Sequence, residues 1–515
     1  MPRRGCVRSS REIVTIQLGK AGTNIGHEFW RDLCVEHEIN YQDDPLLQGV
    51  FTGPPDDPMH KQDHLQVFFN EGPSANRSSG QSRWVPRAIL VDLNMQDLQQ
   101  ITSDDLGNLY RPDNIIGNDE GAANCYAKAF HTEGPDLADA VLELVRREVE
   151  KCNCLQGVQF MHSVSGGTGS GLTGLTLKTL YDYLDRGSKC VLQSVSLVPC
   201  ATAASLLEPY NAALGLQDLL EYCDQCFCFD NDRLTSICQK TQDIAVPKYK
   251  DMNNIVAFCM SNITSSLRFP GALDSDLRKM HTNLVPFKNA HFLTTSFAPL
   301  TSATIKQYRN VNVKDLVQQM IHKDNVTVSC DTTNPGDMRE GKTKARFLAS
   351  FAAFRGSREH LPTSSVDQEL YDLQHNRYDK FFPDWIPNCV ATSLCDVPHA
   401  DFPKASVAFT SNSTAIHEVF DRLIKMWEDM YKSKSFLHVF EQDGISTSDM
   451  VESRNVLQYV SDQYKELAKW PDKFFEEKAG PRSIAAGEDR SDEEMKIIEE
   501  LLHLDDTYIK SSTTV

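Results

Sequence analysis

Four apolar runs in the first two hundred residues predict buried β-strands, and each run ends in a polar or glycine-containing loop. The runs are residues 11–18, 87–92, 157–164 and 191–199. After the third run, apolar residues recur at helical spacing, with Leu177, Leu180 and Leu184 on one face. Strands that alternate with helices predict a doubly wound parallel sheet, in which ligands bind at the carboxyl ends of the strands.

The second half of the chain predicts a mixed region followed by helices. Residues 230–410 combine apolar strands with turns, and the polar stretch 330–346 within them should be an exposed loop. Residues 411–467 carry apolar positions at helical spacing and predict two helices. The acidic tail from residue 468 contains an apolar stripe that predicts an amphipathic helix, either packed on the body, bound to a partner, or weakly formed. The stripe consists of Met495, Ile498, Leu501 and Leu502.

Length, charge and cysteine usage narrow the class of protein. A chain of 515 residues should split into roughly two to four domains. Its net charge of −19 argues against a nucleic-acid-binding surface and favours basic partners. No apolar run approaches the roughly 18–20 residues of a membrane span, and the basic opening ten residues lack the apolar core of a secretory signal. The 15 cysteines form no disulfide framework, so we expect an intracellular protein with reduced thiols.

The strongest chemical motif is the sequence SGGTGSG at residues 165–171, between the third strand and its helix. Glycines let backbone amides approach an anion, the helix N-terminus favours negative charge, and the hydroxyl groups donate further hydrogen bonds. We interpret the motif as a phosphate-binding loop. It lacks the lysine of a Walker A motif and the spacing of a dinucleotide fingerprint. A tight turn without a ligand is the alternative, and the strand–loop–helix context argues against it.

Several segments taken together resemble the tubulin family. They are REIVTIQLGKAGTNIG, RAILVDL, GGTGSG, EPYNAAL, SSLRFPGALDSDLRKMHTNLVP, FAPLTSATIKQYR, DWIPN and SNSTAI. The resemblance covers about residues 11–467 and is greatest to the β class, from which the sequence diverges. It implies a tubulin/FtsZ-like GTP-binding domain (11–229), a core helix and α+β intermediate domain (230–410), and a C-terminal helical hairpin (411–467). Residues 1–10 would form a basic extension and residues 468–515 an acidic tail.

The resemblance also implies a site for GTP or GDP. The implied nucleotide-binding residues are Lys20, Ala21, Asn24, Asp92, Asn124, Ser163, Gly166, Gly167, Thr168, Gly169, Ser170, Glu208, Asn231, Tyr249 and Asn253. Among them, Asp92 would lie near the γ-phosphate and a metal ion, and Glu208 would reach the ribose. Tyr249 would stack on guanine, whose edge the amides of Asn231 and Asn253 would read.

The sequence departs from the family within these same loops. The departures are Lys20 (glutamine in the family), Ala21 (cysteine), Asn94 (an acid), Ala123 (glycine), Ser165 (glycine) and residues 200–205, which lack the ribose-contacting aspartate. Lys20 and Asn94 together add two positive charges beside the phosphates, from which we infer that Lys20 partly replaces Mg²⁺ as the counter-charge. The alternative is relaxed selection in a site that binds nucleotide weakly, so the use of Mg²⁺ and the metal-binding role of Asp92 stay open.

By resemblance, the chain is expected to be a divergent β-like subunit of microtubules in the cytoplasm and cytoskeleton. It would pair longitudinally with an α-type subunit, contact lateral neighbours through Tyr308 and Arg309, and bind basic microtubule-associated proteins. Lys279 stands where the α class carries a catalytic glutamate, so we expect no catalytic residue in this chain alone. Hydrolysis of its own GTP would require a neighbouring subunit. The alternative is a tubulin-fold pseudo-GTPase that serves as a scaffold or cap in a specialised array without nucleotide turnover.

Overall fold

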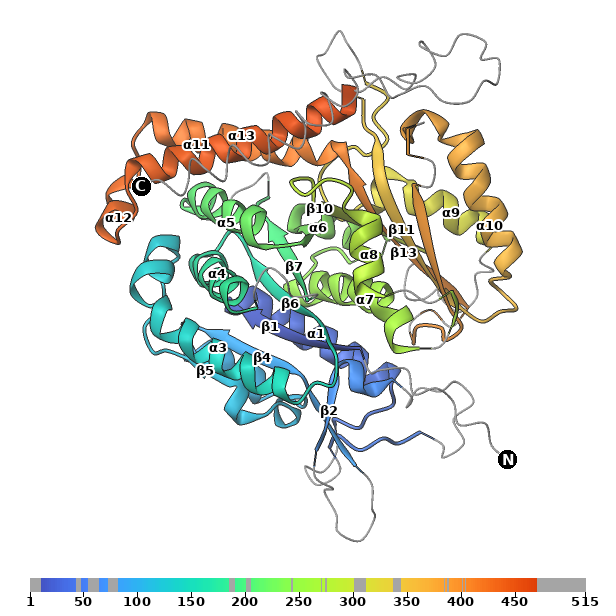
Figure 1. Cartoon of the computed structure of the whole chain (residues 1–515), viewed down its shortest axis with the longest axis horizontal. Helices are drawn as coiled ribbons and strands as arrows, with labels where there is room; N and C mark the ends of the chain where they lie inside the picture. Colours follow the sequence, from blue (N-terminus) through green and yellow to red (C-terminus); the bar gives the residue numbers. More distant parts are fainter. Residues whose placement is uncertain are drawn as a thin grey trace, which may run out of the picture. The chain divides into compact units, whose positions relative to one another are not determined.

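In the computed structural model, the four predicted strands are present and belong to one sheet of eleven strands (Figure 1). The strands of this sheet are β1 (Glu12–Leu18), β4 (Ala88–Asp92), β5 (Ile115–Gly117), β6 (Leu155–Ser163), β7 (Val191–Val198), β8 (Gln225–Asp230), β9 (Gly271–Leu273), β10 (Phe292–Ala298), β11 (Phe347–Gly356), β12 (Val390–Cys395) and β13 (Ala405–Ser413). A separate hairpin consists of β2 (Phe69–Gly72) and β3 (Arg83–Pro86).

The structure describes most of the chain between residues 11 and 469. The described residues are 11–42, 48–53, 64–72, 82–184, 190–200, 205–241, 244–269, 271–273, 276–300, 312–336, 344–383, 385–386, 389–400, 402 and 404–469. The predicted basic extension, the predicted tail helix, and Tyr308 and Arg309 lie outside them, as do residues 337–343 of the predicted exposed loop.

The order of strands confirms the doubly wound parallel sheet. The order is β5-β4-β1-β6-β7-β8-β10-β13-β11-β12-β9. All neighbours from β5 to β10 are parallel, so the carboxyl ends of these strands lie along one edge. Strand β13 is antiparallel to β10 and β11, as expected for an α+β region. The sheet therefore continues without interruption from the parallel region into the mixed one.

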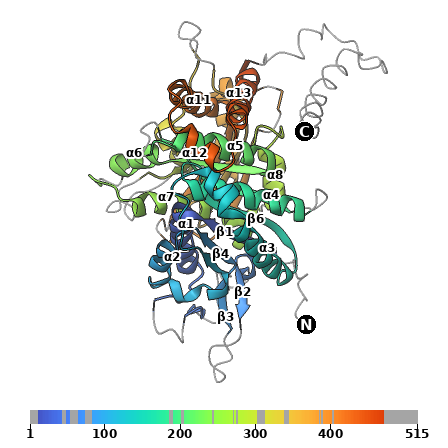
Figure 2. The ribbon, with the colours of Figure 1, turned by 90° about the vertical axis from the view of Figure 1, so that its left-hand side faces the viewer.

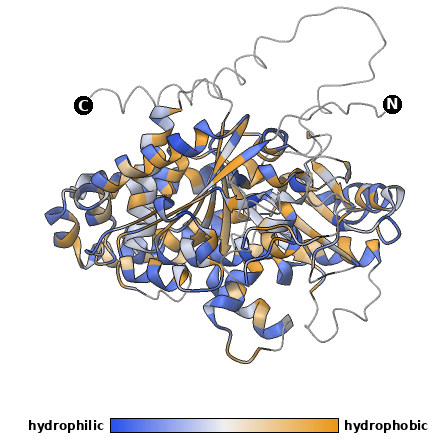
Figure 3. Ribbon diagram, turned by 90° about the horizontal axis from the view of Figure 1, so that it is seen from below, coloured by the Kyte–Doolittle hydropathy of each residue, from blue (hydrophilic) through white to orange (hydrophobic). Residues whose placement is uncertain are grey.

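Helices cover both faces of the sheet. They are α1 (Gly19–Glu36), α2 (Met95–Thr102), α3 (Gly134–Glu150), α4 (Thr173–Tyr183), α5 (Glu208–Tyr222), α6 (Asn231–Thr241), α7 (Tyr249–Arg268), α8 (Leu277–Leu284), α9 (Val313–Ile321), α10 (Thr363–Asp372), α11 (His417–Lys432), α12 (Leu437–Gln442) and α13 (Thr447–Lys469). Figure 2 shows α1 and α2 on one side of β1 and β4, and α3 on the other. Orange and blue positions alternate along many helices in Figure 3, as expected when one face of each helix is buried.

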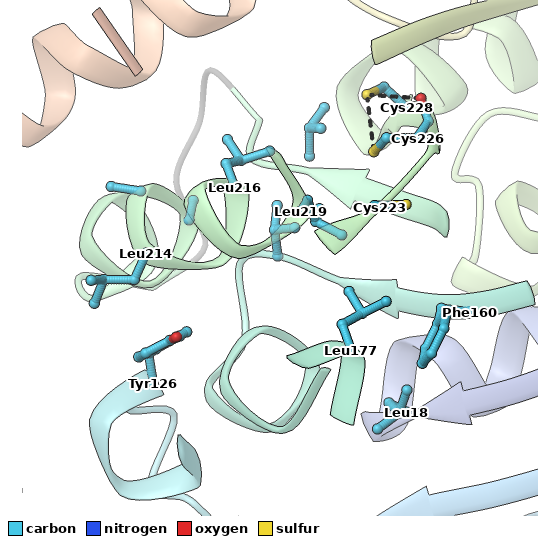
Figure 4. Packing of buried hydrophobic residues seen from close by; sticks show 14 of the residues in the cluster. Leu18, Tyr126, Phe160, Leu177, Leu214, Leu216, Leu219, Cys223, Cys226 and Cys228 are labelled. Atoms are coloured by element: carbon cyan, nitrogen blue, oxygen red, sulfur yellow. Dashed lines mark hydrogen bonds between the residues drawn. The ribbon is translucent and has the colours of Figure 1, made fainter. Parts of the chain in front are cut away.

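Strand β1 contributes side chains to two hydrophobic cores, one on each face of the sheet. Val14, Ile16 and Leu18 are fully buried in the core beneath α3, α4 and α5, whereas Ile13 belongs to the core beneath α1 and α7. Successive side chains of a strand point to opposite faces, so the burial of all seven residues of β1 fits a sheet covered on both sides. Figure 4 shows the first of these cores, in which Leu177 of α4 lies near Phe160 of β6.

The predicted C-terminal helices are present as α11 and α13, with the short helix α12 between them. Both long helices pack against α5, as Figure 1 shows. The ring of Tyr210 on α5 contacts Trp427 of α11 and Phe440 of α12, at centroid distances of 5.9 and 5.6 Å. Helix α5 is therefore held between the sheet and the C-terminal helices.

Candidate functional site

A cavity of about 500 Å³ opens at the carboxyl ends of the parallel strands. Most of the sequence-predicted nucleotide-binding residues line it: Lys20, Ala21, Asn24, Asp92, Asn124, Ser163, Gly166, Gly167, Thr168, Gly169, Asn231, Tyr249 and Asn253. Leu18, Asp97 and Leu197 also line the cavity, although the sequence motifs did not assign them. Segments that are far apart in the chain thus meet at one place, as the topology of the sheet requires.

The glycine-rich loop after β6 forms one wall of the cavity. A Cβ atom on Gly167 would lie 2.5 Å from the backbone nitrogen of Cys125, and one on Gly169 would lie 2.5 Å from the carbonyl oxygen of Ser163. Both positions therefore require glycine, because backbone approaches backbone there. The loop leads through a π-helical turn, Thr168–Leu172, into α4, so that backbone amides and a helix N-terminus face the cavity.

Two buried side chains support this loop from behind. Ser170 does not line the cavity; its hydroxyl donates to the carbonyl oxygen of Gly166 at 2.5 Å. His162 Nδ1 lies 2.8 Å from the carbonyl oxygen of Gly169. Burial lowers the pKa of His162 to about 4, so the ring is neutral at pH 7 and donates this hydrogen bond from Nδ1. In this structure the Ser170 hydroxyl therefore contributes to the shape of the loop.

A second loop, residues 122–125, packs directly against the glycine-rich loop. Asn124 Oδ1 accepts a hydrogen bond from the backbone nitrogen of Gly167 at 3.1 Å, and Asn124 Nδ2 donates to Ser205 Oγ at 2.7 Å. Ala123 and Asn124 have φ angles of 47° and 58°, in the left-handed region. Asparagine tolerates this region, but alanine is strained there by roughly 1–2 kcal/mol. The replacement of glycine by Ala123 therefore leaves strain in the wall of the site.

Charged and polar side chains form the wall near β4. Lys20 Nζ lies 2.8 Å from Asp97 Oδ1, and Asn94 Nδ2 donates to Asp97 Oδ2 at 3.0 Å. Lys20 and the loss of an acid at position 94 add two positive charges to this wall. Asp97, which no sequence motif assigns, offsets one of them. Its place in the first turn of α2, three residues after the N-cap Asn94, was a signal that could have identified it.

Asp92 is the residue of this wall that fits a metal ion. Its side chain is 3% exposed, and burial raises its pKa to about 6. Asp92 Oδ1 accepts from the backbone nitrogen of Asn94 at 3.2 Å, whereas Oδ2 is buried and has no hydrogen-bond partner among the described residues. An unpaired carboxylate oxygen in a cavity suits Mg²⁺, which prefers oxygen ligands and usually binds together with phosphate groups.

A second group of side chains with metal-ligand spacing lies outside this cavity. Potential ligand atoms of Cys200, Asp230 and Asp232 lie within 4.8 Å of one another. However, Arg422 Nη2 lies 3.3 Å from Asp230 Oδ2 and already supplies a positive charge there. Asp230 Oδ1 accepts from the backbone nitrogen of Asp232 at 3.0 Å. These contacts explain the cluster without a metal ion.

The lining of the cavity also includes an exposed aromatic ring and three amides. Tyr249, the first residue of α7, is 72% exposed, so one face of its ring is available to a planar ligand. Asn24, Asn231 and Asn253 line the cavity with side chains that both donate and accept hydrogen bonds. Glu208 is buried at the first position of α5 and does not line the cavity. Lys279 is exposed on α8, away from the cavity lining.

Comparison with known proteins finds two matching family models and several related sequences. A model of the "Tubulin/FtsZ family, GTPase domain" matches residues 12–239, and one of the "Tubulin C-terminal domain" matches residues 289–425. The nucleomorph tubulin beta chain of Guillardia theta is 38% identical over 471 residues, which covers 91% of this chain and 99% of that protein. The tubulin beta chains of Schizophyllum commune and Coprinopsis cinerea are 40% and 39% identical over 458 residues, covering 88% of this chain and 95% of each relative. Among the described helices, none is long and apolar enough to cross a membrane.

Proposed function

The chain belongs to the tubulin family, and on this premise we propose that it is a divergent β-type subunit of microtubules that binds GTP or GDP. The cavity carries the proposal, because its lining combines an anion-binding loop with an aromatic ring and amides. A guanine nucleotide has the matching chemistry: phosphates for the backbone amides, and a planar base with donors and acceptors on its edge. The relatives named above are tubulin beta chains, which supports the same assignment.

In this proposal, the phosphates lie against the loop that contains Gly166, Gly167 and Thr168, and Asn124 contacts the terminal phosphate. Tyr249 stacks on the base, and Asn231 and Asn253 read its edge. Asp92 would hold Mg²⁺ together with phosphate oxygens, and the ion would supply positive charge against the phosphates. Lys20, which also lines the cavity, would supply a further positive charge to the phosphates.

We further propose that the chain pairs with an α-type tubulin subunit and has lateral tubulin neighbours in the polymer. Lys279 would face the nucleotide of a neighbouring subunit, where a cation stabilises phosphates without activating water. Hydrolysis of the nucleotide in the cavity would then depend on a residue supplied by an α-type neighbour. Tyr308 and Arg309 would belong to the lateral contact, and the net charge of −19 would favour basic microtubule-associated proteins in the cytoplasm.

The proposal is tested by extracting the bound nucleotide from purified protein and chromatographing it, with and without Mg²⁺ during purification. We expect stoichiometric GTP or GDP. Tyr249→Ala should lower guanine-nucleotide affinity about tenfold, since stacking on an aromatic ring contributes roughly 1–3 kcal/mol. Tyr371→Ala is the matched control, because Tyr371 is also exposed (63%) but lies on α10 outside the cavity.

Three results would contradict the proposal. An empty site in both preparations would favour a scaffold that does not bind nucleotide. Equal affinities for GTP and ATP would contradict a guanine site. Failure to co-purify with co-expressed α-type tubulin as a heterodimer would remove the proposed pairing and leave nucleotide binding untouched.

A further inference from the structure

One buried amide connects the two adjoining loops that contribute Asn124 and Gly166 to Gly169 to the cavity lining. Asn211 lies in the first turn of α5 and is fully buried. Its Oδ1 accepts a hydrogen bond from the backbone nitrogen of Tyr126 at 2.9 Å. Its Nδ2 donates to the carbonyl oxygens of Asn124 at 2.9 Å and Ser165 at 3.2 Å. The side chain therefore uses both of its donor hydrogens and its acceptor, all on backbone groups of the two loops.

One strained residue lies where the two loops touch. Ala123 has a positive φ angle, which alanine adopts only when the surroundings enforce it. Its neighbour Asn124 contributes the side-chain oxygen that accepts from the backbone nitrogen of Gly167 at 3.1 Å. A change in the Asn211 contacts would thus release the strained loop and alter its distance from the glycine-rich loop.

Helix α5 is a rigid support for this connection. Tyr210, next to Asn211, is fully buried and packs against Trp427 and Phe440 of the C-terminal helices. Two turns further along α5, Asp218 Oδ2 accepts a hydrogen bond from Tyr126 Oη at 2.5 Å. The loop is thereby attached to one helix at two points seven residues apart. Because the loop is attached to a rigid helix at two points, its atoms can be held in the positions that phosphate recognition requires.

We propose that Asn211 is a positioning residue that sets the separation of the two phosphate-facing loops and thereby determines the discrimination between guanosine triphosphate and diphosphate. The inference rests on the proposed guanine-nucleotide site. The terminal phosphate is the group that distinguishes the two ligands, and Asn124 is the residue proposed to contact it. Asn211 itself does not line the cavity, so it acts on the ligand through the loops.

The test is the ratio of GTP to GDP affinity in Asn211→Asp, measured by equilibrium dialysis with Mg²⁺ on the full chain. Aspartate keeps the shape and the acceptor for Tyr126, but it places an oxygen against two carbonyl oxygens. We expect affinity for GTP to fall about tenfold or more, which corresponds to the loss of a hydrogen bond to a charged group. Affinity for GDP should change less than about threefold, because GDP lacks the terminal phosphate.

A matched control is Asn412→Asp on β13. Asn412 is also fully buried, and its Nδ2 donates to two backbone carbonyls, those of Leu284 at 3.0 Å and Ala290 at 2.6 Å, outside the cavity. This variant should lose stability but keep the wild-type GTP to GDP ratio. Asn211→Ser introduces no charge, and we expect it to lower the ratio in the same direction if Asn211→Asp does not fold.

Hydrogen exchange on the unmodified protein provides a test without any variant. The amide of Tyr126 should be protected with either nucleotide bound, whereas the amide of Gly167 should be better protected with GTP. An unchanged affinity ratio in a folded Asn211 variant, an equal loss in Asn412→Asp, or an unprotected Tyr126 amide would overturn the proposal. A wild-type protein that binds neither nucleotide would instead refute the proposed function on which the inference depends.

Discussion

Replacement of Glu36 by glutamine should destabilise the protein strongly, although Glu36 lies far from the cavity lining. Its carboxylate is 1% exposed at the end of α1. Glu36 Oε2 accepts from Arg268 of α7 at 2.7 Å, and Oε1 accepts from Arg355 of β11 at 2.6 Å. Both arginine side chains are fully buried. One carboxylate therefore joins an N-terminal helix, the long helix α7 and a strand of the α+β region.

The expected loss of stability follows from the two buried guanidinium groups that the substitution leaves without a negative charge. Glutamine keeps the size of the side chain but removes the negative charge that the two guanidinium groups share. Breaking a buried ion pair by removing one partner costs roughly 3–5 kcal/mol, because the remaining charge is buried without compensation. An unfolding entropy of about 2.1 cal/mol/K per residue, taken over residues 1–470, gives roughly 1 kcal/mol/K. We therefore expect the unfolding midpoint to fall by roughly 3–5 °C.

The assay is thermal unfolding by scanning calorimetry at one scan rate, with saturating guanine nucleotide in every sample. Glu148→Gln is the matched control. Glu148 is as buried as Glu36, but it accepts from the neutral amides of Asn70 (2.6 Å) and Asn114 (3.2 Å) and from Lys151, whose side chain is 39% exposed. Lys151 and the second cation near Glu148, Arg111 at 3.8 Å with a side chain 29% exposed, both remain in contact with water, so the control should shift the midpoint by less than half as much. Equal shifts in the two variants would refute the reasoning.

The pH dependence supplies an independent check on the same group. Burial alone would raise the pKa of Glu36, but the positive charges of Arg355, Arg268 and His399 outweigh it and hold the pKa well below its ordinary value of 4.5. The carboxylate therefore stabilises the protein fully above about pH 4.5, and this contribution is lost as the pH falls from there towards the folded-state pKa. The difference between wild type and Glu36→Gln should be constant between pH 6 and 8, and it should shrink below about pH 4.5. A difference that persists unchanged at pH 4 and below would show that charge is not its cause.

Three further predictions concern the cavity. Gly167→Ala should abolish measurable nucleotide binding, because its Cβ would lie 2.5 Å from the backbone nitrogen of Cys125; wild-type affinity in equilibrium dialysis would contradict the close approach. Ala123→Gly should raise stability by about 1 kcal/mol, since glycine adopts the φ of 47° without strain; an unchanged or lower calorimetric midpoint would contradict this. Lys20→Gln should lower nucleotide affinity in EDTA about tenfold and much less in excess Mg²⁺, as expected for loss of a cation beside phosphates. Full affinity of this variant in EDTA would exclude Lys20 as a counter-charge.

The fold could be predicted largely because buried parallel strands leave a local signal. A strand such as β6 is covered on both faces, so six of its nine residues are buried, and Val158, Phe160 and Met161 make the run visible in the sequence. The glycine-rich loop is equally visible, since close backbone approach restricts Gly167 and Gly169 to one residue type. All fourteen described cysteines are free thiols. Even the neighbouring Cys226 and Cys228 have sulfur atoms 3.9 Å apart, which is too far for a disulfide bond (Figure 4).

The details that the sequence did not reveal depend on contacts between distant positions. The ion pair of Lys20 joins residues 77 positions apart, so no local pattern identifies Asp97 as its partner. The amide of Asn211 contacts a residue 87 positions away, and in the sequence it is one polar residue among apolar helix positions. Ser170 belongs to the motif, but its hydroxyl turns back onto its own loop, which depends on the π-helical turn and not on residue type. Such contacts follow from the three-dimensional packing of elements whose existence the sequence does predict.

These contacts also bear on how the departures from the family pattern should be understood. If the site had lost its ligand and selection on it had relaxed, we would expect the residues that differ from the family pattern to lack stabilising contacts. Here Lys20 is paired with Asp97, and the strained loop at Ala123 is held by hydrogen bonds from Asn211. Each of these features thus has a specific partner, and Asp92, which lines the cavity, keeps a buried carboxylate oxygen without a hydrogen-bond partner among the described residues. The geometry is that of an altered nucleotide site whose walls are still held in place, which favours a nucleotide-binding subunit over an empty scaffold.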